Sequence, residues 1–245
     1  MGKTVIVTGS ARGIGRAAAM AFAENGYGVL VNYLHSRDQA EALAGSLRDK
    51  GAAAVACRAD VRDRAQVRRM VETCLSAFGG IDVLINNAGI SRQTLFTDIT
   101  EAEWDAMMDV HVKGTFHCSQ CVLGHMLEKK AGNIINVSSV WGMTGASCEV
   151  HYSTAKAAVI GFTKALAKEV GPSRIRVNCI APGIIQTEMN GFLTKDETRV
   201  LIEQTPLQRF GTAGEVARCM LFLASDAADF ITGQVLSVDG GLLMH

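Results

Sequence analysis

Tyr152 and Lys156 stand four residues apart, and Ser139 precedes them in a separate segment of the chain. Residues Ser153–Ala167 carry apolar side chains at helical intervals, so a helix here would present Tyr152 and Lys156 on one face. A free phenol ionises at about pH 10, and an ammonium group beside it stabilises the phenolate and lowers its pKa. The pair could therefore act as a general acid/base on a carbonyl or alcohol, with Ser139 donating a hydrogen bond to the same oxygen. Helices also carry such pairs by chance, so the hypothesis depends on the rest of the chain.

A glycine-rich turn near the start of the chain has the composition of a phosphate-binding loop. It reads Thr8-Gly9-Ser10-Ala11-Arg12-Gly13-Ile14-Gly15. Gly9 would permit a tight turn, Gly13 would let the backbone approach a phosphate, and Gly15 would let a helix pack on a strand. The following helix would offer unpaired N–H groups and its positive dipole end to a pyrophosphate. One alternative is an ordinary glycine-rich turn. A nucleoside triphosphate loop is excluded, because it would need Lys-Ser or Lys-Thr after Gly15, where this chain has Arg16-Ala17.

The end of the second expected strand indicates which dinucleotide would bind. An NAD site usually has a carboxylate there to bind the ribose hydroxyls, but residues Asn32–Ser36 contain no acid. Arg12 in the glycine loop, with His35, Ser36 and Arg37, could instead hold a 2′-phosphate through charge-assisted hydrogen bonds. We therefore expect NADP(H).

Short β-branched runs alternate with longer helix-periodic stretches such as Ala65–Phe78 and Trp104–Lys130. The expected strands are Val5–Thr8, Val29–Tyr33, Ala53–Arg58, Val83–Asn86, Ile134–Ser138, Arg176–Ile180 and Val235–Val238. Helix ends are expected before four glycines, Gly26, Gly51, Gly79 and Gly132. Ser36 and Gln39 have the spacing of a capping box.

This order predicts an α/β protein with one domain over residues 1–245. We expect a Rossmann-type doubly wound parallel sheet of about seven strands with helices on both faces. Its ligand would lie beyond the carboxyl ends of the strands, where the strand order reverses. The segment from about 184 to 212 is long for a connection and contains a helix-like run, Lys195–Glu203, so it is expected to form a substrate lid.

Composition excludes several classes of protein. Formal net charge is zero, which argues against nucleic acid or a membrane as the main partner. The strand-like run Thr4–Thr8 begins too early for a signal peptide, and seven scattered cysteines indicate reduced thiols, so a cytoplasmic location is expected. Cys118 and Cys121 form a C-x-x-C pair in an expected helix and are interpreted as packing thiols, with no metal site. Cys148, just before Tyr152, would line the substrate mouth, and Glu149 and His151 in the same loop could touch the substrate, although a position at the rim is favoured.

Together these motifs resemble the short-chain dehydrogenase/reductase family, over essentially the whole chain. The matching residues are Thr8–Gly15, Asp60-Val61, Asn86-Asn87-Ala88-Gly89, Ser139, Tyr152-x3-Lys156, Pro182-Gly183 and Asp239-Gly240-Gly241. Within the family the chain looks most like the 3-oxoacyl-[acyl-carrier-protein] reductases of fatty-acid synthesis, through stretches that many other reductases share.

The resemblance implies NADPH-dependent reduction of a carbonyl, with a 3-oxoacyl thioester as the leading substrate. Tyr152 would donate the proton, Lys156 would hold the nicotinamide ribose and tune the tyrosine, and Ser139 would orient the carbonyl. Another ketone or alcohol, such as a sugar, polyol or sterol, stays open as the substrate. A catalytically weak cofactor-binding subunit is a second alternative.

The resemblance also implies further cofactor contacts and an assembly. Asp60 and Val61 would border the adenine, Asn87 would lie against the adenosine ribose, and Gly183-Ile184 would border the nicotinamide. A homotetramer would form through Trp104–Lys130, Tyr152–Val170 and the C-terminal segment. An acyl carrier protein could dock on four bases, or these could be scattered surface charges: Lys129, Lys130, Arg174 and Arg176.

One residue departs from the family pattern. The family usually has an asparagine in an Asn-x-x-Gly setting before the fifth strand, where this chain has His111-Val112-Lys113-Gly114. That asparagine is thought to hold a water that links the lysine to solvent. His111 could replace it in such a relay and titrate near neutral pH, or it could be a packed histidine.

Overall fold

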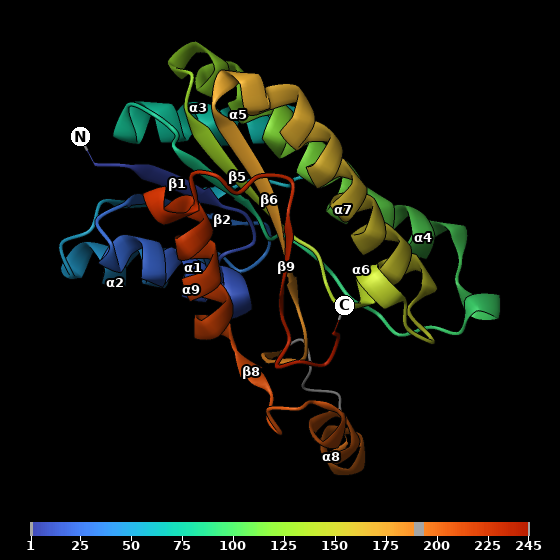
Figure 1. The fold of residues 1–245 in the computed structure, drawn as a ribbon. Coiled ribbons are helices and arrows are strands. Elements are labelled where there is room, and N and C mark those ends of the chain that lie inside the picture. Colours follow the sequence, from blue (N-terminus) through green and yellow to red (C-terminus); the bar gives the residue numbers. More distant parts are fainter. Residues whose placement is uncertain (1, 189–193, 245) are drawn as a thin grey trace.

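The computed structural model describes residues 2–188 and 194–244. Seven parallel strands form one sheet in the order β3-β2-β1-β4-β5-β6-β9 (Figure 1). All seven expected strands are confirmed. They are β1 (Thr4–Val7), β2 (Gly28–Tyr33), β3 (Ala54–Arg58), β4 (Val83–Asn86), β5 (Gly132–Val137), β6 (Ile175–Pro182) and β9 (Val235–Val238). The order reverses between β1 and β4, so a crevice is expected beyond the carboxyl ends of these two strands.

The central strands are buried on both faces, and for this reason their sequences are continuously apolar. Val5 and Val7 of β1 join one hydrophobic cluster, whereas Ile6 between them joins the other. Leu84 and Ile85 of β4 are divided between the clusters in the same way. Because alternate side chains point to opposite faces, one sheet supports two separate cores.

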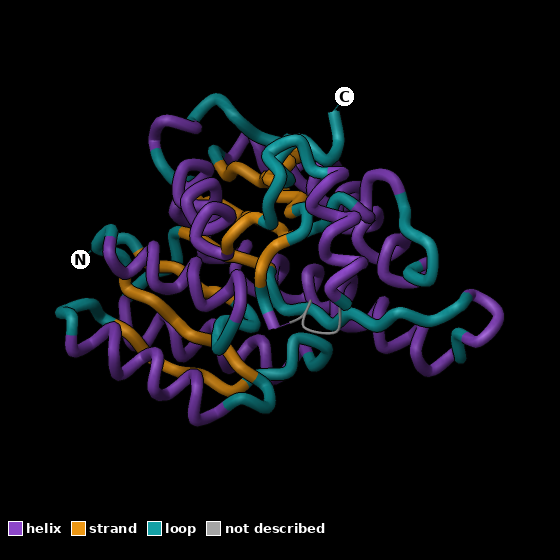
Figure 2. The backbone as a smooth tube through the Cα atoms, turned by 90° about the horizontal axis from the view of Figure 1, so that it is seen from below, coloured by secondary structure: helices purple, strands orange, loops and turns teal. Residues whose placement is uncertain are grey.

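Helices cover the two faces in two layers (Figure 2). The first layer packs on the cluster of Val5 and comprises α1 (Gly13–Glu24), α2 (Arg37–Asp49) and α9 (Ala213–Ala224). The second layer packs on the cluster of Ile6 and comprises α3 (Arg64–Phe78), α5 (Gly114–Lys129) and α7 (Val150–Val170). The expected Rossmann-type doubly wound α/β fold is therefore confirmed.

The stretch expected as one helix over Trp104–Lys130 is divided into three parts. Helix α4 (Glu101–Met108) begins at a capping box of Thr100 and Glu103. A π-helical turn, η2 (Asp109–Lys113), then leads into α5. Single π turns within α-helices are often found at functional sites, and this one contains the buried His111.

One of the expected helix signals is wrong, and a second lies slightly beyond the end of its helix. Ser36 is the N-cap of α2, but its side chain makes no capping hydrogen bond, so there is no capping box with Gln39. Helix α5 ends at Lys130 in the left-handed region, with a φ of 52°, and Gly132 is already the first residue of β5. The other three glycines, Gly26, Gly51 and Gly79, have positive φ values at helix ends, as expected.

The segment between β6 and α9 contains the helix expected in the lid. Helix α8 (Lys195–Gln204) lies below the sheet in Figure 1, away from the other helices. Two short strands that were not expected, β7 (Ile185–Gln186) and β8 (Gly211–Thr212), pair where the segment leaves and rejoins the domain. Residues 189–193 of the expected lid lie outside the described residues.

The remaining short elements are η1 (Phe96–Asp98), α6 (Trp141–Thr144), η3 (Gly171–Ser173) and η5 (Asp226–Ala228). In the described ranges, no helix combines the length and the apolar character needed to cross a membrane.

Candidate active site

A cavity of about 130 Å³ opens at the carboxyl ends of β4, β5 and β6. It is lined by eight of the predicted catalytic and cofactor-binding residues: Ile14, Asn87, His111, Ser139, Tyr152, Lys156, Gly183 and Ile184. A larger hollow of about 540 Å³ lies near the amino ends of β1 and β2, beside Tyr27 and Phe78. That hollow contains none of the predicted site residues, so the smaller cavity is the candidate active site.

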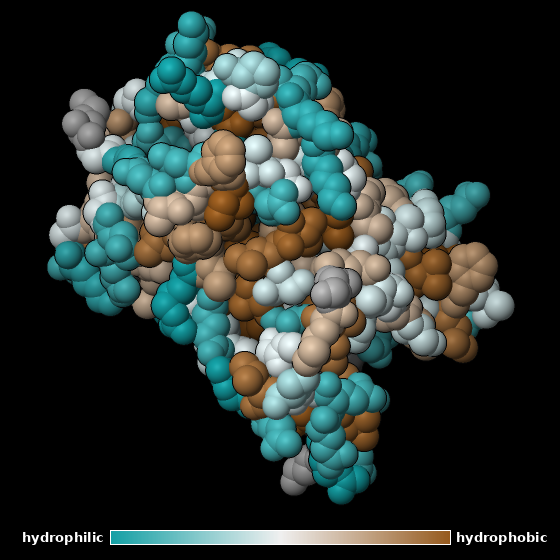
Figure 3. Space-filling view, viewed as in Figure 1, coloured by the Kyte–Doolittle hydropathy of each residue, from teal (hydrophilic) through white to brown (hydrophobic). Residues whose placement is uncertain are grey.

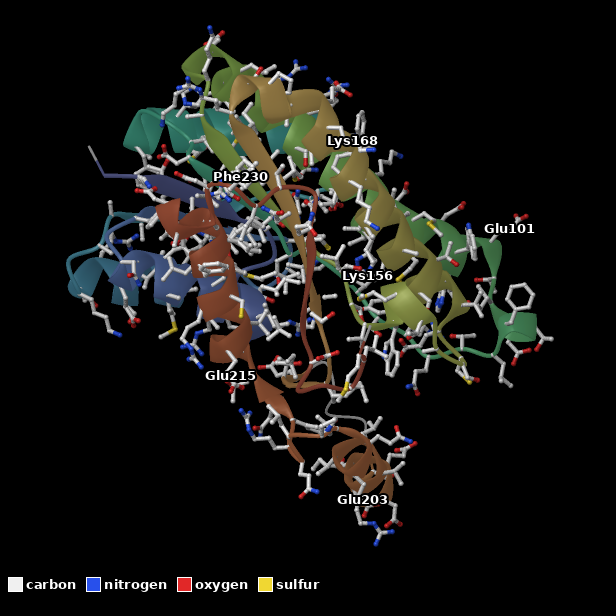
Figure 4. The ribbon with its side chains drawn as sticks, in the orientation of Figure 1. Glu101, Lys156, Lys168, Glu203, Glu215 and Phe230 are labelled. Atoms are coloured by element: carbon white, nitrogen blue, oxygen red, sulfur yellow. The ribbon has the colours of Figure 1, made fainter. Side chains whose placement is uncertain are left out.

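Lys156 is held deep in this cavity by backbone contacts. Its side chain extends from the middle of α7 (Figure 4), and only 4% of the residue is exposed. The Nζ atom donates a hydrogen bond to the carbonyl oxygen of Val137 at 2.8 Å. The Ser138 hydroxyl donates to the backbone oxygen of Lys156, also at 2.8 Å, and so ties α7 to the end of β5. These contacts fix the lysine beside the strand end that bears Ser139.

Tyr152 and Ser139 face the same cavity as Lys156. The Nζ atom of Lys156 lies 5.6 Å from the centre of the Tyr152 ring. Burial raises the pKa of Tyr152 to about 12, although a hydrogen bond with Ser139 acts to lower it. Burial also lowers the pKa of Lys156 to about 8. In this geometry the loss of hydration outweighs the expected effect of the lysine on the phenol, so Tyr152 keeps its proton at neutral pH.

His111 is a neutral, buried group beside Tyr152. Its Nε2 atom lies 2.7 Å from the carbonyl oxygen of Ile90, and its ring meets that of Tyr152 edge to face at a centroid distance of 5.5 Å. Burial lowers the pKa of His111 well below its ordinary value, and the charge of Lys156 lowers it further. The structure therefore favours a histidine that is neutral near pH 7 over one that titrates there. It can still pass a proton as a neutral imidazole, or serve only for packing.

The glycine loop has the shape that a phosphate-binding turn requires. Gly9 and Gly13 have positive φ values of 63° and 56°. A Cβ atom at Gly15 would lie 2.5 Å from Nδ2 of Asn87 and 2.6 Å from the oxygen of Gly9, so only glycine fits there. By contrast, a Cβ at Gly13 would meet only Thr187, at 3.8 Å, which leaves the loop open at the start of α1. The loop therefore fits the diphosphate of a dinucleotide.

Asn32 is a structural residue of this loop that the sequence did not single out. It is buried at the end of β2, and its Oδ1 accepts a hydrogen bond from the N–H of Gly9 at 3.0 Å. Its Nδ2 donates to the carbonyl oxygens of Cys57 and Ala59. An amide inside an otherwise apolar strand was the available signal, because a buried polar side chain needs partners.

Asn87 braces the loop from the other side. Its Nδ2 donates to the carbonyl oxygens of Thr8 and Gly9, at 2.9 and 3.1 Å. The same residue lines the cavity.

The turn after β6 is close-packed, since a Cβ at Gly183 would lie 2.7 Å from Cα of Asp239.

The residues expected near the adenosine lie farther along the same edge of the sheet. Arg12 is the N-cap of α1, and its exposed guanidinium lies 3.5 Å from the carboxylate of Glu188. His35 is exposed and Ser36 is half-buried at the start of α2. Asp60 and Val61 follow β3. The Asp60 carboxylate accepts hydrogen bonds from Arg62, and Val61 is buried. These residues do not line the cavity, as expected for the far half of an extended dinucleotide.

Three of the four residues just before Tyr152 differ from expectation. Glu149 is only 7% exposed and lines the cavity, so it is not a rim residue. His151 is fully buried, and neither of its ring nitrogens has a hydrogen-bond partner in the described residues. Cys148 has a left-handed φ of 61° and its carbonyl accepts a hydrogen bond from Thr94, but it does not line the cavity.

All seven cysteines are free thiols. Cys118 and Cys121 lie within α5, where Cys118 is buried in the core. Among the described residues, no group of three or more potential ligand side chains could hold a metal ion.

Comparison with known proteins agrees with this geometry. Residues 9–243 match the family described as enoyl-(acyl carrier protein) reductase. The chain is 43% identical to the 3-oxoacyl-[acyl-carrier-protein] reductase FabG of Staphylococcus epidermidis over 244 residues, 100% of both chains. The 3-oxoacyl-[acyl-carrier-protein] reductase of Synechocystis sp. is 43% identical over 99% of this chain and 97% of its own length. FabG of Thermotoga maritima is 40% identical over 99% of this chain and 98% of its own length. The chain is therefore a member of the short-chain dehydrogenase/reductase family, an oxidoreductase with a nicotinamide cofactor.

Proposed function

We propose that this enzyme reduces a 3-oxoacyl thioester, carried by acyl carrier protein, to the 3-hydroxyacyl form with NADPH. The observation that carries the proposal is that Ser139, Tyr152 and Lys156 face one cavity at the edge of the sheet where a dinucleotide would bind. The choice of substrate is supported by the names of relatives that are 40–43% identical over nearly the whole chain.

The reduced nicotinamide, when bound, supplies the hydride. Tyr152 donates the proton to the carbonyl oxygen, a role for which a phenol that stays protonated at neutral pH is suited. Ser139 donates a hydrogen bond to the same oxygen and orients it. Lys156, whose ammonium is held by the Val137 carbonyl, compensates the negative charge that develops on Tyr152.

The preference for NADPH is supported at the end of β2. The residues there, Asn32–Ser36, include no carboxylate, and Arg12 has a guanidinium that is exposed at the mouth of the glycine loop. Its contact with Glu188 is long and solvent-exposed, and such surface pairs contribute little, so the guanidinium can turn to a 2′-phosphate. Gly9, Gly13 and the first N–H groups of α1 would hold the diphosphate.

We also propose that the segment 184–212 acts as the substrate lid. Ile184, Ile185 and Thr187 at its start line the cavity, so a movement of this segment would change the shape of the site.

We further propose a cytoplasmic location for the enzyme, which its seven free thiols support.

A homotetramer remains part of the proposal. Apolar side chains gather across the face between α9 and α7 in Figure 3. Phe116 and Leu127 of α5 and Phe222 of α9 are exposed large hydrophobic residues, and Phe230 is fully exposed. Faces of this kind are typical of subunit interfaces.

The four bases considered for carrier-protein docking do not support that role. All four lie toward the amino ends of β5 and β6, whereas the cavity opens at the carboxyl ends. Two of them already have partners, because Lys129 pairs with Asp82 and Arg176 donates to the carbonyl oxygens of Leu223 and Ser225. A carrier protein that delivers its thioester to the cavity must dock elsewhere.

The test measures loss of reduced-nicotinamide absorbance with acetoacetyl thioester, in parallel with NADPH and NADH. Oxidation of NADPH, and little of NADH, is the expected result. Tyr152→Phe should retain cofactor binding and lose most of the turnover. A protein that binds NADPH but does not oxidise it would reject the thioester as substrate. Full activity of the Tyr152→Phe variant would reject the assignment of the acid.

A further inference from the structure

Glu149 is a buried acid in the active-site cavity to which the proposed reaction gives no role. It is the N-cap residue of α7, three positions before Tyr152, and is only 7% exposed. Its side chain makes no capping hydrogen bond to the helix, unlike those of Thr100, Thr194 and Thr212 at other helix starts. Helix capping therefore does not explain the carboxylate.

The carboxylate also lacks a cationic partner in the described part of the chain. Among the described residues, no lysine, arginine or histidine nitrogen forms a salt bridge with Glu149. Burial raises the pKa of Glu149, and a hydrogen bond with the Gln93 side chain acts in the opposite direction. The lysine of the cavity and the arginine next to Gln93 are engaged elsewhere. Lys156 donates to the Val137 carbonyl, and Arg92 pairs with Glu103 at 2.8 Å. The pKa of Glu149 is raised because the ionised carboxylate loses its hydration on burial, and a positive group from outside the chain would offset that cost.

The position of the carboxylate defines where that group would lie. Glu149 lines the cavity together with Ser139, Trp141 and Tyr152. Its charge is close enough to Tyr152 to raise the pKa of the phenol. A cation held at Glu149 would therefore belong to the molecule whose carbonyl is placed at Tyr152.

We propose that Glu149 binds a protonated amine of the substrate, and that the enzyme reduces ketones carrying such an amine in addition to neutral 3-oxoacyl thioesters. The inference rests on the proposed carbonyl reduction at Tyr152. The chemistry is unchanged: a hydride from NADPH forms a C–H bond at the carbonyl carbon, Tyr152 protonates the oxygen, and NADP⁺ is released. What Glu149 adds is a charge-assisted hydrogen bond to the ammonium, in a site that largely excludes water.

The experiment compares kcat/KM for ketones that differ only in an amine. One pair is 4-(dimethylamino)butan-2-one and 5-methylhexan-2-one, and a second pair, 5-(dimethylamino)pentan-2-one and 6-methylheptan-2-one, is longer by a methylene group. Tertiary amines are used because they cannot condense with the carbonyl to an imine. The ratio of the two kcat/KM values in each pair isolates the effect of the charge, and NADPH oxidation is the readout.

The parent enzyme should prefer the amine about tenfold or more in at least one pair, the size expected for a hydrogen bond to a charged group. Glu149→Gln should bring the ratio close to one, while Glu149→Asp, which keeps the charge, should retain a preference. Glu101→Gln is the matched control, because Glu101 is an exposed acid on α4, remote from Lys156 in Figure 4. It should keep the parent ratio.

Equal turnover of both members of each pair by the parent would overturn the inference, whether or not the Glu149 variants fold. A preference for the amine that persists in a folded Glu149→Gln variant would overturn it as well. If the parent reduces acetoacetyl thioester but shows no preference, only this inference fails. If it reduces neither the thioester nor any of the ketones, the proposed function fails too.

Discussion

Lys156→Met separates the electrostatic cost of a buried ammonium from its use in catalysis. Burial lowers the pKa of Lys156 from an ordinary value of 10.5 to about 8. At about 1.36 kcal/mol per pH unit, keeping the ammonium charged in the folded protein costs about 3 kcal/mol below pH 8. Methionine has a similar length and carries no charge. The substitution would, however, remove the hydrogen bond from Nζ to the carbonyl of Val137, which should lower stability by about 1–3 kcal/mol. At pH 7 the variant should therefore be as stable as the parent, or more stable by up to about 2 kcal/mol.

The pH dependence is the sharper measurement, because the loss at Val137 does not change with pH. Between about pH 8 and 10.5 the unfolded lysine binds a proton that the folded one has released. The unfolded state then holds more protons, so the stability of the parent rises with pH in this window. Relative to Lys156→Met, the parent should gain about 2 kcal/mol between pH 7 and pH 9.5.

Urea unfolding followed by tryptophan fluorescence, at one protein concentration and with a reductant present, measures this difference. Any association of subunits then contributes equally to the measured stability of the parent and of Lys156→Met. Lys168→Met is the control, because Lys168 is an exposed lysine on the same helix (Figure 4), and its difference from the parent should not change with pH. A difference between the parent and Lys156→Met that is constant from pH 7 to 9.5 would refute the reasoning. The same variant should also lose nearly all reductase activity.

Three further predictions concern the cofactor loop and His111. Gly15→Ala places a Cβ 2.5 Å from Nδ2 of Asn87, so the variant should lose about 1–3 kcal/mol of stability. A thermal scan should show a lower melting temperature, and a titration should show weaker NADPH binding. An unchanged melting temperature would contradict the packing argument. Arg12→Ala should raise the Kd for NADPH about tenfold and change that for NADH little, and an equal change for both would exclude a 2′-phosphate contact. His111→Asn should leave the shape of the pH–rate profile between pH 6 and 8 unchanged, because His111 is already neutral there; loss of a limb in this range would show that the histidine titrates.

Predictions from the sequence were most accurate for features that depend on the conformation and burial of a few neighbouring residues. All seven strands were predictable, and the signal was clearest in central strands such as β1 and β4, which are buried on both faces and need uninterrupted β-branched and apolar residues. Gly9 and Gly13 were predictable because their backbone conformation excludes most other residues. Signals at helix ends were less reliable. Ser36 begins α2 without the capping hydrogen bond that its spacing with Gln39 predicted, since spacing does not determine where a side chain points.

The order of the elements, the glycine loop and the spacing of Tyr152 and Lys156 were determined by the sequence alone, because each depends on residues close together in the chain. Protonation states and partners were decided only by the tertiary structure. Burial by distant segments keeps Tyr152 protonated and His111 neutral, and no local pattern contains that information. Likewise, the sequence favours a position at the rim for Glu149, but in the folded chain this residue is buried and lines the cavity. The pKa of a side chain and its exposure to solvent depend on everything that surrounds it, and that environment is assembled only when the chain folds.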